Sequence, residues 1–259
     1  EGRAFRVHLP QLADYVHKKC SGCWLNRLSR LYDVIYIDEV QDLCGYDLEI
    51  LGYLVNSGIE IRMVGDIRQA VIATNPQESK NKKYMYSKIW TWFQELERKG
   101  AIRITQNCET WRCRPEISCF ADQLFGPEWG FNSTVSNNSR TTDHDGLFLV
   151  RRRDLQLYLQ TFQPLLLRHS ANSGRNLSYG FTNYKESKGL SVERVCILPT
   201  ADIEKYLRGK GGLKDSQSME LYVAVTRAEQ SVAFIVDDPS GISISTWHPE
   251  GGTKDLMPD

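Results

Sequence analysis

Two short apolar runs, each ending in a polar turn, set the strongest limit on how this chain can fold. Residues 33–37 read Asp-Val-Ile-Tyr-Ile and lead directly into two acids, and residues 59–64 lead into Gly65 and Asp66. Apolar runs this short are typical of strands that are buried in a parallel sheet. The chain is therefore expected to form parallel strands whose carboxyl ends carry polar residues.

The rest of the chain repeats this pattern. Helical spacing occurs at residues 9–19, 46–56, 89–99, 115–124, 154–162 and 216–228, and further apolar runs occur at 101–105, 147–150, 165–167, 192–198 and 231–236. Strands that alternate with helices predict an α/β fold with helices on both faces of parallel sheets. A domain boundary is expected near residues 105–110, and the residues after about 237 are expected to form a loose tail.

Composition excludes several classes of protein. The 32 basic and 32 acidic residues cancel, so a nucleic-acid site would have to be a local patch rather than a general basic character. No apolar run approaches the ~20 residues of a membrane span, so no membrane partner is expected. The seven cysteines are odd in number and scattered, which is typical of reduced thiols in a cytoplasmic protein.

A C-x-x-C pair, Cys20 and Cys23, allows a second interpretation of the cysteines. With His8 and His17 nearby it could supply ligands to zinc. However, zinc needs four ligands in tetrahedral geometry, and no second pair follows at finger spacing. The sequence therefore favours ordinary thiols over a zinc site.

The first chemical signal is the acid pair Asp38 and Glu39, directly after the first apolar run. Ligands of open α/β sheets bind at the carboxyl ends of strands. One acid there can hold Mg²⁺ while the next deprotonates an attacking water, as nucleotide hydrolysis requires. The alternative is a solvated acidic turn after a buried strand.

Later segments add an amide and two arginines. Gln69 follows the second apolar run, Arg112 stands just before a predicted helix, and Arg227 ends another. An arginine aimed across a cleft neutralises charge on a transferring phosphoryl group, although an arginine at a helix end is more often a cap or a surface ion pair.

Taken together, these segments resemble the superfamily-1 helicases of the UvrD/Rep type. The resemblance covers residues 32–236. In family order, motifs II to VI correspond to residues 38–42, 65–69, 107–113, 187–190 and 222–228.

The resemblance implies a P-loop NTPase-like fold with two RecA-like parallel-sheet domains and ATP between them. Residues 1–106 would be the remainder of an incomplete first domain, residues 107–240 the second, and residues 241–259 a tail. By the same resemblance Asp38 would hold Mg²⁺ and Glu39 would be the catalytic base.

The remaining roles come from the same comparison. Gln69 would contact the γ-phosphate and the attacking water, and Arg112 and Arg227 would reach the phosphates. The Gly189 backbone would lie beside the nucleotide. Residues 182–187 would lie near single-stranded DNA, with Thr182, Lys185 and Ser187 as the contacts.

One departure from the family is large. No G-x-x-x-x-G-K-[ST] phosphate loop occurs in the sequence, so hydrolysis is expected only together with an upstream segment that supplies one. The expected function is an ATP-dependent DNA helicase or translocase core that acts on single-stranded DNA in repair or anti-phage defence, with a nuclease as a candidate partner. The alternative is a non-hydrolysing nucleic-acid-binding or scaffolding module that keeps the helicase fold.

Overall fold

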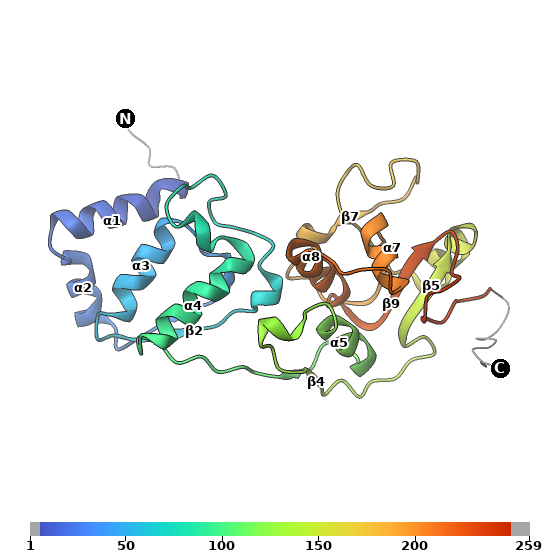
Figure 1. Ribbon diagram of the computed structural model, residues 1–259, viewed down its shortest axis with the longest axis horizontal. Helices are drawn as coiled ribbons and strands as arrows, with labels where there is room; N and C mark the ends of the chain where they lie inside the picture. The colour runs from blue at the N-terminus through green and yellow to red at the C-terminus, as the bar shows by residue number, and fades with distance from the viewer. Residues whose placement is uncertain (1–5, 250–259) are drawn as a thin grey trace. The chain divides into compact units, whose positions relative to one another are not determined.

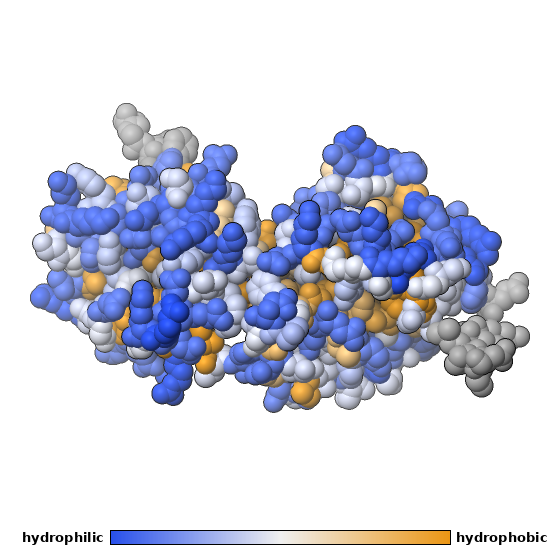
Figure 2. Space-filling model, viewed as in Figure 1, coloured by the Kyte–Doolittle hydropathy of each residue, from blue (hydrophilic) through white to orange (hydrophobic). Residues whose placement is uncertain are grey.

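The computed structural model describes residues 6–249, which divide into two compact units at Thr105 and Gln106 (Figure 1). We call residues 6–105 the N-terminal unit and residues 106–249 the C-terminal unit, and each is described by itself. On the face shown in Figure 2, hydrophilic residues cover most of each unit.

The N-terminal unit contains four helices and one parallel strand pair in its described residues. The elements are α1 (Leu9–Lys19), α2 (Cys23–Leu31), β1 (Val34–Ile37), α3 (Tyr46–Val55), β2 (Glu60–Met63) and α4 (Ile89–Arg98). β1 and β2 run parallel, with Val34 opposite Glu60 and Ile37 opposite Met63. Helix α3 buries Leu48, which begins an apolar stripe that recurs every three residues.

The predicted third strand at residues 101–105 does not form. The N–H of Ile104 donates to Glu97 Oε1 at 2.7 Å, and the N–H of Ala101 donates to Leu96 O at 3.0 Å. These bonds tie the segment to the end of α4 in place of a strand partner. The strand prediction is therefore wrong, because a nearby helix end and its side chain satisfy the backbone first.

The C-terminal unit is built on a larger sheet. Its elements are β3 (Glu109–Thr110), α5 (Pro115–Asp122), β4 (Val135–Ser136), β5 (Gly146–Arg151), α6 (Leu155–Phe162), β6 (Leu165–Arg168), β7 (Thr182–Asn183), β8 (Val192–Leu198), α7 (Ala201–Leu207), α8 (Asp215–Val225) and β9 (Ala228–Val236). In the described residues five strands form one sheet in the order β5-β9-β8-β6-β7, and every pairing is parallel. The predicted parallel α/β fold is confirmed.

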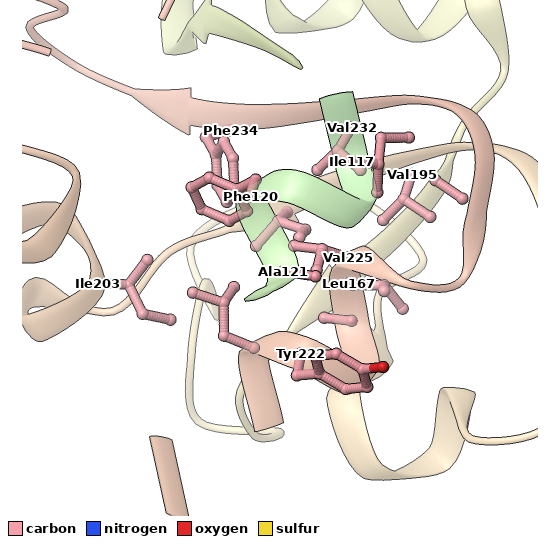
Figure 3. Packing of buried hydrophobic residues seen from close by; sticks show 14 of the residues in the cluster. Ile117, Phe120, Ala121, Leu167, Val195, Ile203, Tyr222, Val225, Val232 and Phe234 are labelled. Atoms are coloured by element: carbon pink, nitrogen blue, oxygen red, sulfur yellow. The ribbon is translucent and has the colours of Figure 1, made fainter. Parts of the chain in front are cut away.

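Burial explains why these strands are so apolar. Residues 231–236 of β9 are fully buried, since the strand lies inside the sheet with helices packed against it. Ile117 and Phe120 of α5 pack on this core, and the ring of Phe120 lies 5.6 Å from that of Phe234 (Figure 3). Fully burying one such side chain contributes about 1.5–3 kcal/mol. The core therefore fixes the ends of β8 and β9, where the site residues stand.

The predicted loose tail is wrong for residues 241–249. Leu149 of β5 donates its N–H to Ser245 O at 2.8 Å and accepts from the N–H of Trp247 at 2.8 Å. The Trp247 ring packs edge-on against Tyr158 at 5.1 Å. A polar composition suggested a loose segment, but these long-range contacts attach it to β5. The rest of the predicted tail, residues 250–259, lies outside the described residues.

The prediction that all cysteines are reduced is wrong for one pair. Cys20 and Cys23 form a disulfide, with their Cα atoms 5.4 Å apart. Gly22, with φ of 81°, turns the chain between them, which a residue with a side chain rarely does. The other five cysteines are thiols. In the described part of the chain no three His, Cys, Asp or Glu side chains are placed to hold a metal. There too, every helix is too short or too polar to cross a membrane.

Candidate functional site

The acid pair stands at the carboxyl end of β1. Asp38 is exposed, and its Oδ1 accepts the N–H of Glu39 at 2.7 Å. Glu39 takes a left-handed backbone conformation, with φ of 52°, and its carboxylate accepts a hydrogen bond from the Gln41 amide. The turn thus leaves the Asp38 carboxylate exposed to solvent, and the Gln41 amide holds the Glu39 carboxylate in place.

The end of β2 lies beside this turn. Val40 donates its N–H to Val64 O at 3.2 Å, which connects the two strand ends. Beyond them Asp66 Oδ2 accepts the side-chain amide of Gln69 at 3.0 Å. Asp38, Glu39 and Gln69 therefore all follow the carboxyl edge of one parallel sheet.

Gly65 allows the two turns to approach closely. A Cβ atom at this position would stand 2.3 Å from Gln41 Oε1 and 3.2 Å from the Val40 backbone nitrogen. Gln41 itself is 1% exposed, and its Oε1 is buried with no hydrogen-bond partner among the described residues. The glycine is thus required by packing, and it fixes the glutamine that supports Glu39.

These residues suit Mg²⁺ rather than a metal with a full protein cage. Mg²⁺ takes oxygen ligands and is usually held by one or two carboxylates together with substrate phosphates and water. Asp38 offers one exposed carboxylate, and Glu39 lies next to it. The residues present therefore fit a Mg²⁺–nucleotide complex, with Asp38 as the protein ligand.

In the C-terminal unit four segments far apart in the sequence meet at the amino edge of the sheet. Arg112 donates from one guanidinium nitrogen to Thr226 O at 3.4 Å. Asn138 donates to Arg112 O at 2.7 Å and to Glu229 O at 3.1 Å. Ser191 donates to Glu229 Oε1 at 3.2 Å. Arg112 of the predicted motif IV thus contacts Thr226 of the predicted motif VI, and Ser191, which directly follows the predicted motif V, contacts Glu229 at the start of β9.

Arg227 does not face solvent in this arrangement. It is 1% exposed, and its guanidinium donates to Val223 O at 2.9 Å, Leu190 O at 3.2 Å and Thr226 Oγ1 at 3.1 Å. These bonds join the end of α8 to the turn that contains Gly189, an exposed residue with φ of 87°. In this conformation Arg227 holds the turn in place and cannot also contact a ligand.

A cleft of about 470 Å³ opens at the same edge, lined by Trp111, Arg112, Asn138, Arg140, Ser191, Glu229 and Gln230. Trp111 is 75% exposed, which is unusual for so large an aromatic residue. Sequence reasoning selected Arg112 and passed over Trp111. The available signal was an aromatic residue directly before an arginine at the start of a predicted helix.

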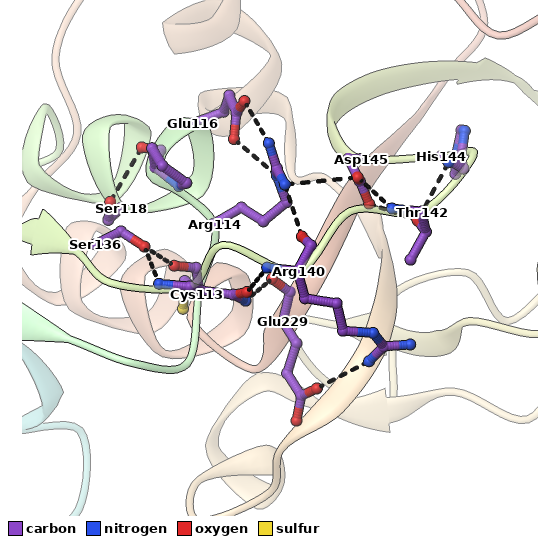
Figure 4. A network of polar contacts seen from close by, with 12 residues as sticks. Cys113, Arg114, Glu116, Ser118, Ser136, Arg140, Thr142, His144, Asp145 and Glu229 are labelled. Carbon is purple, nitrogen blue, oxygen red and sulfur yellow. Dashed lines mark hydrogen bonds and ion pairs between the residues drawn. The ribbon is translucent and has the colours of Figure 1, made fainter.

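A polar network supports the wall of this cleft (Figure 4). Arg114 donates to Arg140 O at 2.7 Å and pairs with Glu116 at 3.2 Å, and the Arg140 guanidinium pairs with Glu193 at 2.7 Å and Glu229 at 3.7 Å. The hydrogen bond from Arg114 lowers the pKa of Glu116, and that from Arg140 lowers the pKa of Glu193. The carboxylates are thus held in their charged form, which keeps the arginines in position.

The predicted DNA contacts lie elsewhere in the C-terminal unit. Thr182 pairs with Leu167 in the sheet, and Lys185 is exposed with its Nζ 3.2 Å from Glu220 Oε1. Ser187 is fully buried and donates its hydroxyl to Tyr184 O at 2.7 Å. Of these three residues, only Lys185 presents its side chain to solvent as an exposed residue.

No protein-family model matches the chain, and no curated protein matches it. Similar solved structures include a PRRSV helicase, at 18% identity and a TM-score of 0.45, which covers 78% of this chain and 34% of that one. Another is an arterivirus nonstructural protein 10 helicase solved with DNA, at 15% identity and a TM-score of 0.45, covering 79% and 39%. A further arterivirus nonstructural protein 10 helicase has 13% identity and a TM-score of 0.43, covering 81% and 41%. The chain spans less than half the length of each.

Proposed function

We propose that this chain is part of the motor core of a superfamily-1 helicase-like NTPase, with RecA-like units that use ATP and Mg²⁺ to move along single-stranded nucleic acid. One observation carries the proposal. Arg112, from the segment that resembles motif IV, lines a cleft in the C-terminal unit and bonds to Thr226 O of the motif VI segment, whose Arg227 bonds to Leu190 O of the motif V segment. A surface without a ligand has no physical need for that convergence.

The side chains of the cleft suit a nucleotide. An exposed tryptophan offers a flat face on which a base can stack, and Arg112 and Arg140 offer planar guanidinium groups that match phosphate geometry. Glu229 in the same cleft can accept hydrogen bonds from ribose hydroxyls. We therefore assign the base to Trp111 and the phosphates to Arg112.

The N-terminal unit would supply the hydrolytic groups. Mg²⁺, when bound with the nucleotide, neutralises phosphate charge during transfer. Asp38 would hold the metal, Glu39 would take the proton of the attacking water, and Gln69 would orient that water through its amide. The grip on the β- and γ-phosphates must come from a phosphate loop, which this sequence does not contain.

Single-stranded DNA is the proposed track, with Lys185 and Thr182 beside it and with repair or anti-phage defence, alongside a nuclease, as the setting. The restriction to DNA and the resemblance to the UvrD/Rep type rest on the sequence motifs alone.

One observation favours the second candidate, a nucleic-acid-binding module that does not hydrolyse ATP. The guanidinium of Arg227 is bonded to three protein oxygens, whereas a phosphate contact would require it to exchange those bonds. In a module of this kind Arg227 would be purely structural.

Photolabelling of the cleft tests the motor proposal. With 8-azido-ATP and Mg²⁺, we expect ultraviolet light to attach the label to the peptide that contains Trp111, and excess ATP to displace it. Trp111→Ala and Arg112→Ala should each reduce labelling about tenfold, as loss of about 1.4 kcal/mol of binding would. Leu157→Ala, which removes another exposed apolar side chain of the same unit, is the matched control. Labelling that ATP does not displace, or that Trp111→Ala leaves unchanged, would remove the nucleotide from this cleft.

A further inference from the structure

The proposed motor makes no use of the Cys20–Cys23 disulfide. We infer that it is a thiol–disulfide exchange site, whose co-substrate is a small or protein-borne thiol of the glutathione class. Its position between two helices, the exposure of Cys23 and the hydrogen bonding of Cys20 together carry this inference.

The pair is accessible where most of the other cysteines are not. Cys23 is exposed and Cys20 is half-buried, whereas Cys44, Cys113 and Cys196 are buried. Burial raises the pKa of Cys113 to about 11, so that thiol stays protonated and unreactive. Of the other two cysteines, Cys119 is also exposed, but it is a single thiol with no bonded partner. An exchange reaction within the chain needs two adjacent sulfurs, and this turn provides them.

The local backbone favours a thiolate at Cys20. Cys20 closes α1, and Cys23 is the first residue of α2, whose nine residues turn their first N–H groups towards the turn. The N–H of Cys23 donates to Cys20 Sγ at 3.3 Å. A donor from the first turn of a helix stabilises negative charge on that sulfur. Cys20 is therefore the sulfur suited to leave and to attack.

Exchange takes two steps, in each of which a co-substrate thiolate attacks a disulfide. A thiolate of the co-substrate attacks the exposed Cys23 Sγ, the sulfur–sulfur bond breaks, and Cys20 leaves as a thiolate that the Cys23 N–H stabilises. A second co-substrate thiolate attacks its partner in the mixed disulfide and releases Cys23. Two electrons and two protons pass to the pair, and two thiols become one disulfide. The reverse sequence restores the bond.

An aromatic cluster lies next to this turn. His17 stacks on Tyr53 at 3.8 Å, and the ring of Trp24 lies 5.2 Å from His17. The indole N–H of Trp24 donates to Ala13 O at 3.2 Å, which holds α2 against α1. Trp24 directly follows Cys23 in the chain, so its fluorescence should report the state of the pair.

A redox titration of the whole chain tests the inference. The chain is equilibrated in buffers of reduced and oxidised glutathione, quenched with acid, alkylated and analysed by peptide mass spectrometry. We expect Cys20 and Cys23 to become alkylated together in a single two-electron transition, with a parallel change in fluorescence that Trp24→Phe abolishes. Cys119→Ser is the matched control and should leave the transition unchanged.

Single variants test the assignment of the attacking sulfur. In Cys23→Ser, Cys20 should be alkylated by iodoacetamide at neutral pH about tenfold faster than Cys119 is in the same chain, because the Cys20 thiolate is stabilised. Two separate alkylated thiols under excess oxidised glutathione would overturn the inference. So would a disulfide that excess reduced glutathione cannot open in the folded chain, or stoichiometric zinc bound after reduction.

Discussion

The two units place their predicted functional residues at opposite edges of their sheets. In the N-terminal unit Asp38 and Gln69 follow the carboxyl ends of β1 and β2, as ligand-binding residues in open α/β sheets usually do. In the C-terminal unit Gly189 and Arg227 precede the amino ends of β8 and β9. Residues predicted to be functional can therefore lie at either edge of a parallel sheet. The edge decides whether turns or helices surround their side chains.

The support differs in the same way. Residues after a strand sit on short turns, so Asp38 remains exposed, and a backbone N–H and the Gln41 amide bond to the two carboxylates. Residues before a strand are enclosed by the helices that lead into it, so Arg227 is buried among carbonyl oxygens. The exposed Asp38 can offer its charge to a ligand, whereas the buried Arg227 fixes a turn.

The largest effect is expected from Arg227→Ala. The change leaves buried carbonyl oxygens without donors and removes the link between α8 and the Gly189 turn, so it should destabilise the C-terminal unit by about 3 kcal/mol or more. Arg112→Ala, which loses one long hydrogen bond at a half-buried site, should cost about 1 kcal/mol or less. Urea unfolding monitored by hydrogen exchange measures the free energy of unfolding of both variants. Equal stability of the two variants would show that Arg227 is not part of the framework.

Glu39→Gln should remove catalysis without removing the fold. In a protein that joins this chain to a phosphate-loop segment, we expect ATP turnover to fall ~10²-fold or more, because a general base is lost. Glu60→Gln, an exposed acid on β2, is the control and should leave turnover unchanged. The chain alone should release no phosphate from ATP. Robust hydrolysis by the chain alone would reveal a phosphate-binding device of another kind.

Gly65→Ala should destabilise the N-terminal unit by about 1–3 kcal/mol, since the added methyl group overlaps Gln41 and the Val40 backbone. Gly52→Ala is the matched control. It lies within α3 with nothing near its missing Cβ, and should stabilise the unit by roughly 0.5–1 kcal/mol. Thermal unfolding compares the two variants. A neutral Gly65→Ala would mean that the two turns are not tightly packed.

Acid should weaken the C-terminal unit through His144. Burial lowers the pKa of His144 to about 4, with its ring stacked at 3.8 Å on Phe148 and 3.9 Å on Phe162. Since the unfolded chain binds this proton near pH 6.5, stability should be full above that pH and fall as the pH drops towards 4. His144→Gln should flatten the fall in the urea midpoint between pH 7 and 5. An identical pH dependence in the variant would contradict this.

The smallest effect is expected from Lys185→Ala. Loss of one exposed charge near the proposed DNA track should weaken binding of an oligothymidine about threefold, and the loss should shrink as salt is added. Lys210→Ala, an exposed lysine in a loop before α8, is the control. Fluorescence anisotropy measures the affinity, and an equal change in both variants would indicate that only general charge matters.

Local pattern was enough to predict much of the fold. α1 begins and ends at the predicted residues, although its apolar residues Leu9, Leu12 and Val16 are exposed. β8 has the predicted bounds, because its apolar run reflects burial in the sheet. Arg112 and Thr226, from the predicted motif IV and motif VI segments, are in contact, and their roles stay predictions.

Other features depend on contacts that local pattern cannot show. Burial of Arg227 needs Leu190 from another segment, and the attached tail needs Leu149, nearly a hundred residues earlier. The unformed strand at residues 101–105 was apolar enough, but a neighbouring carboxylate on Glu97 competed for its backbone. Nothing in the spacing of Cys20 and Cys23 separates a disulfide from two thiols.

The segment attached to β5 has a consequence for how this unit behaves in a crowded solution. β5 is the outer strand of the sheet, and an outer strand with open backbone groups is a template for pairing with other chains. Ser245 and Trp247 occupy the two backbone groups of Leu149, so part of that template is already used. Removing residues 242–249 would expose the backbone groups of β5. The C-terminal unit would then favour self-association over the monomer.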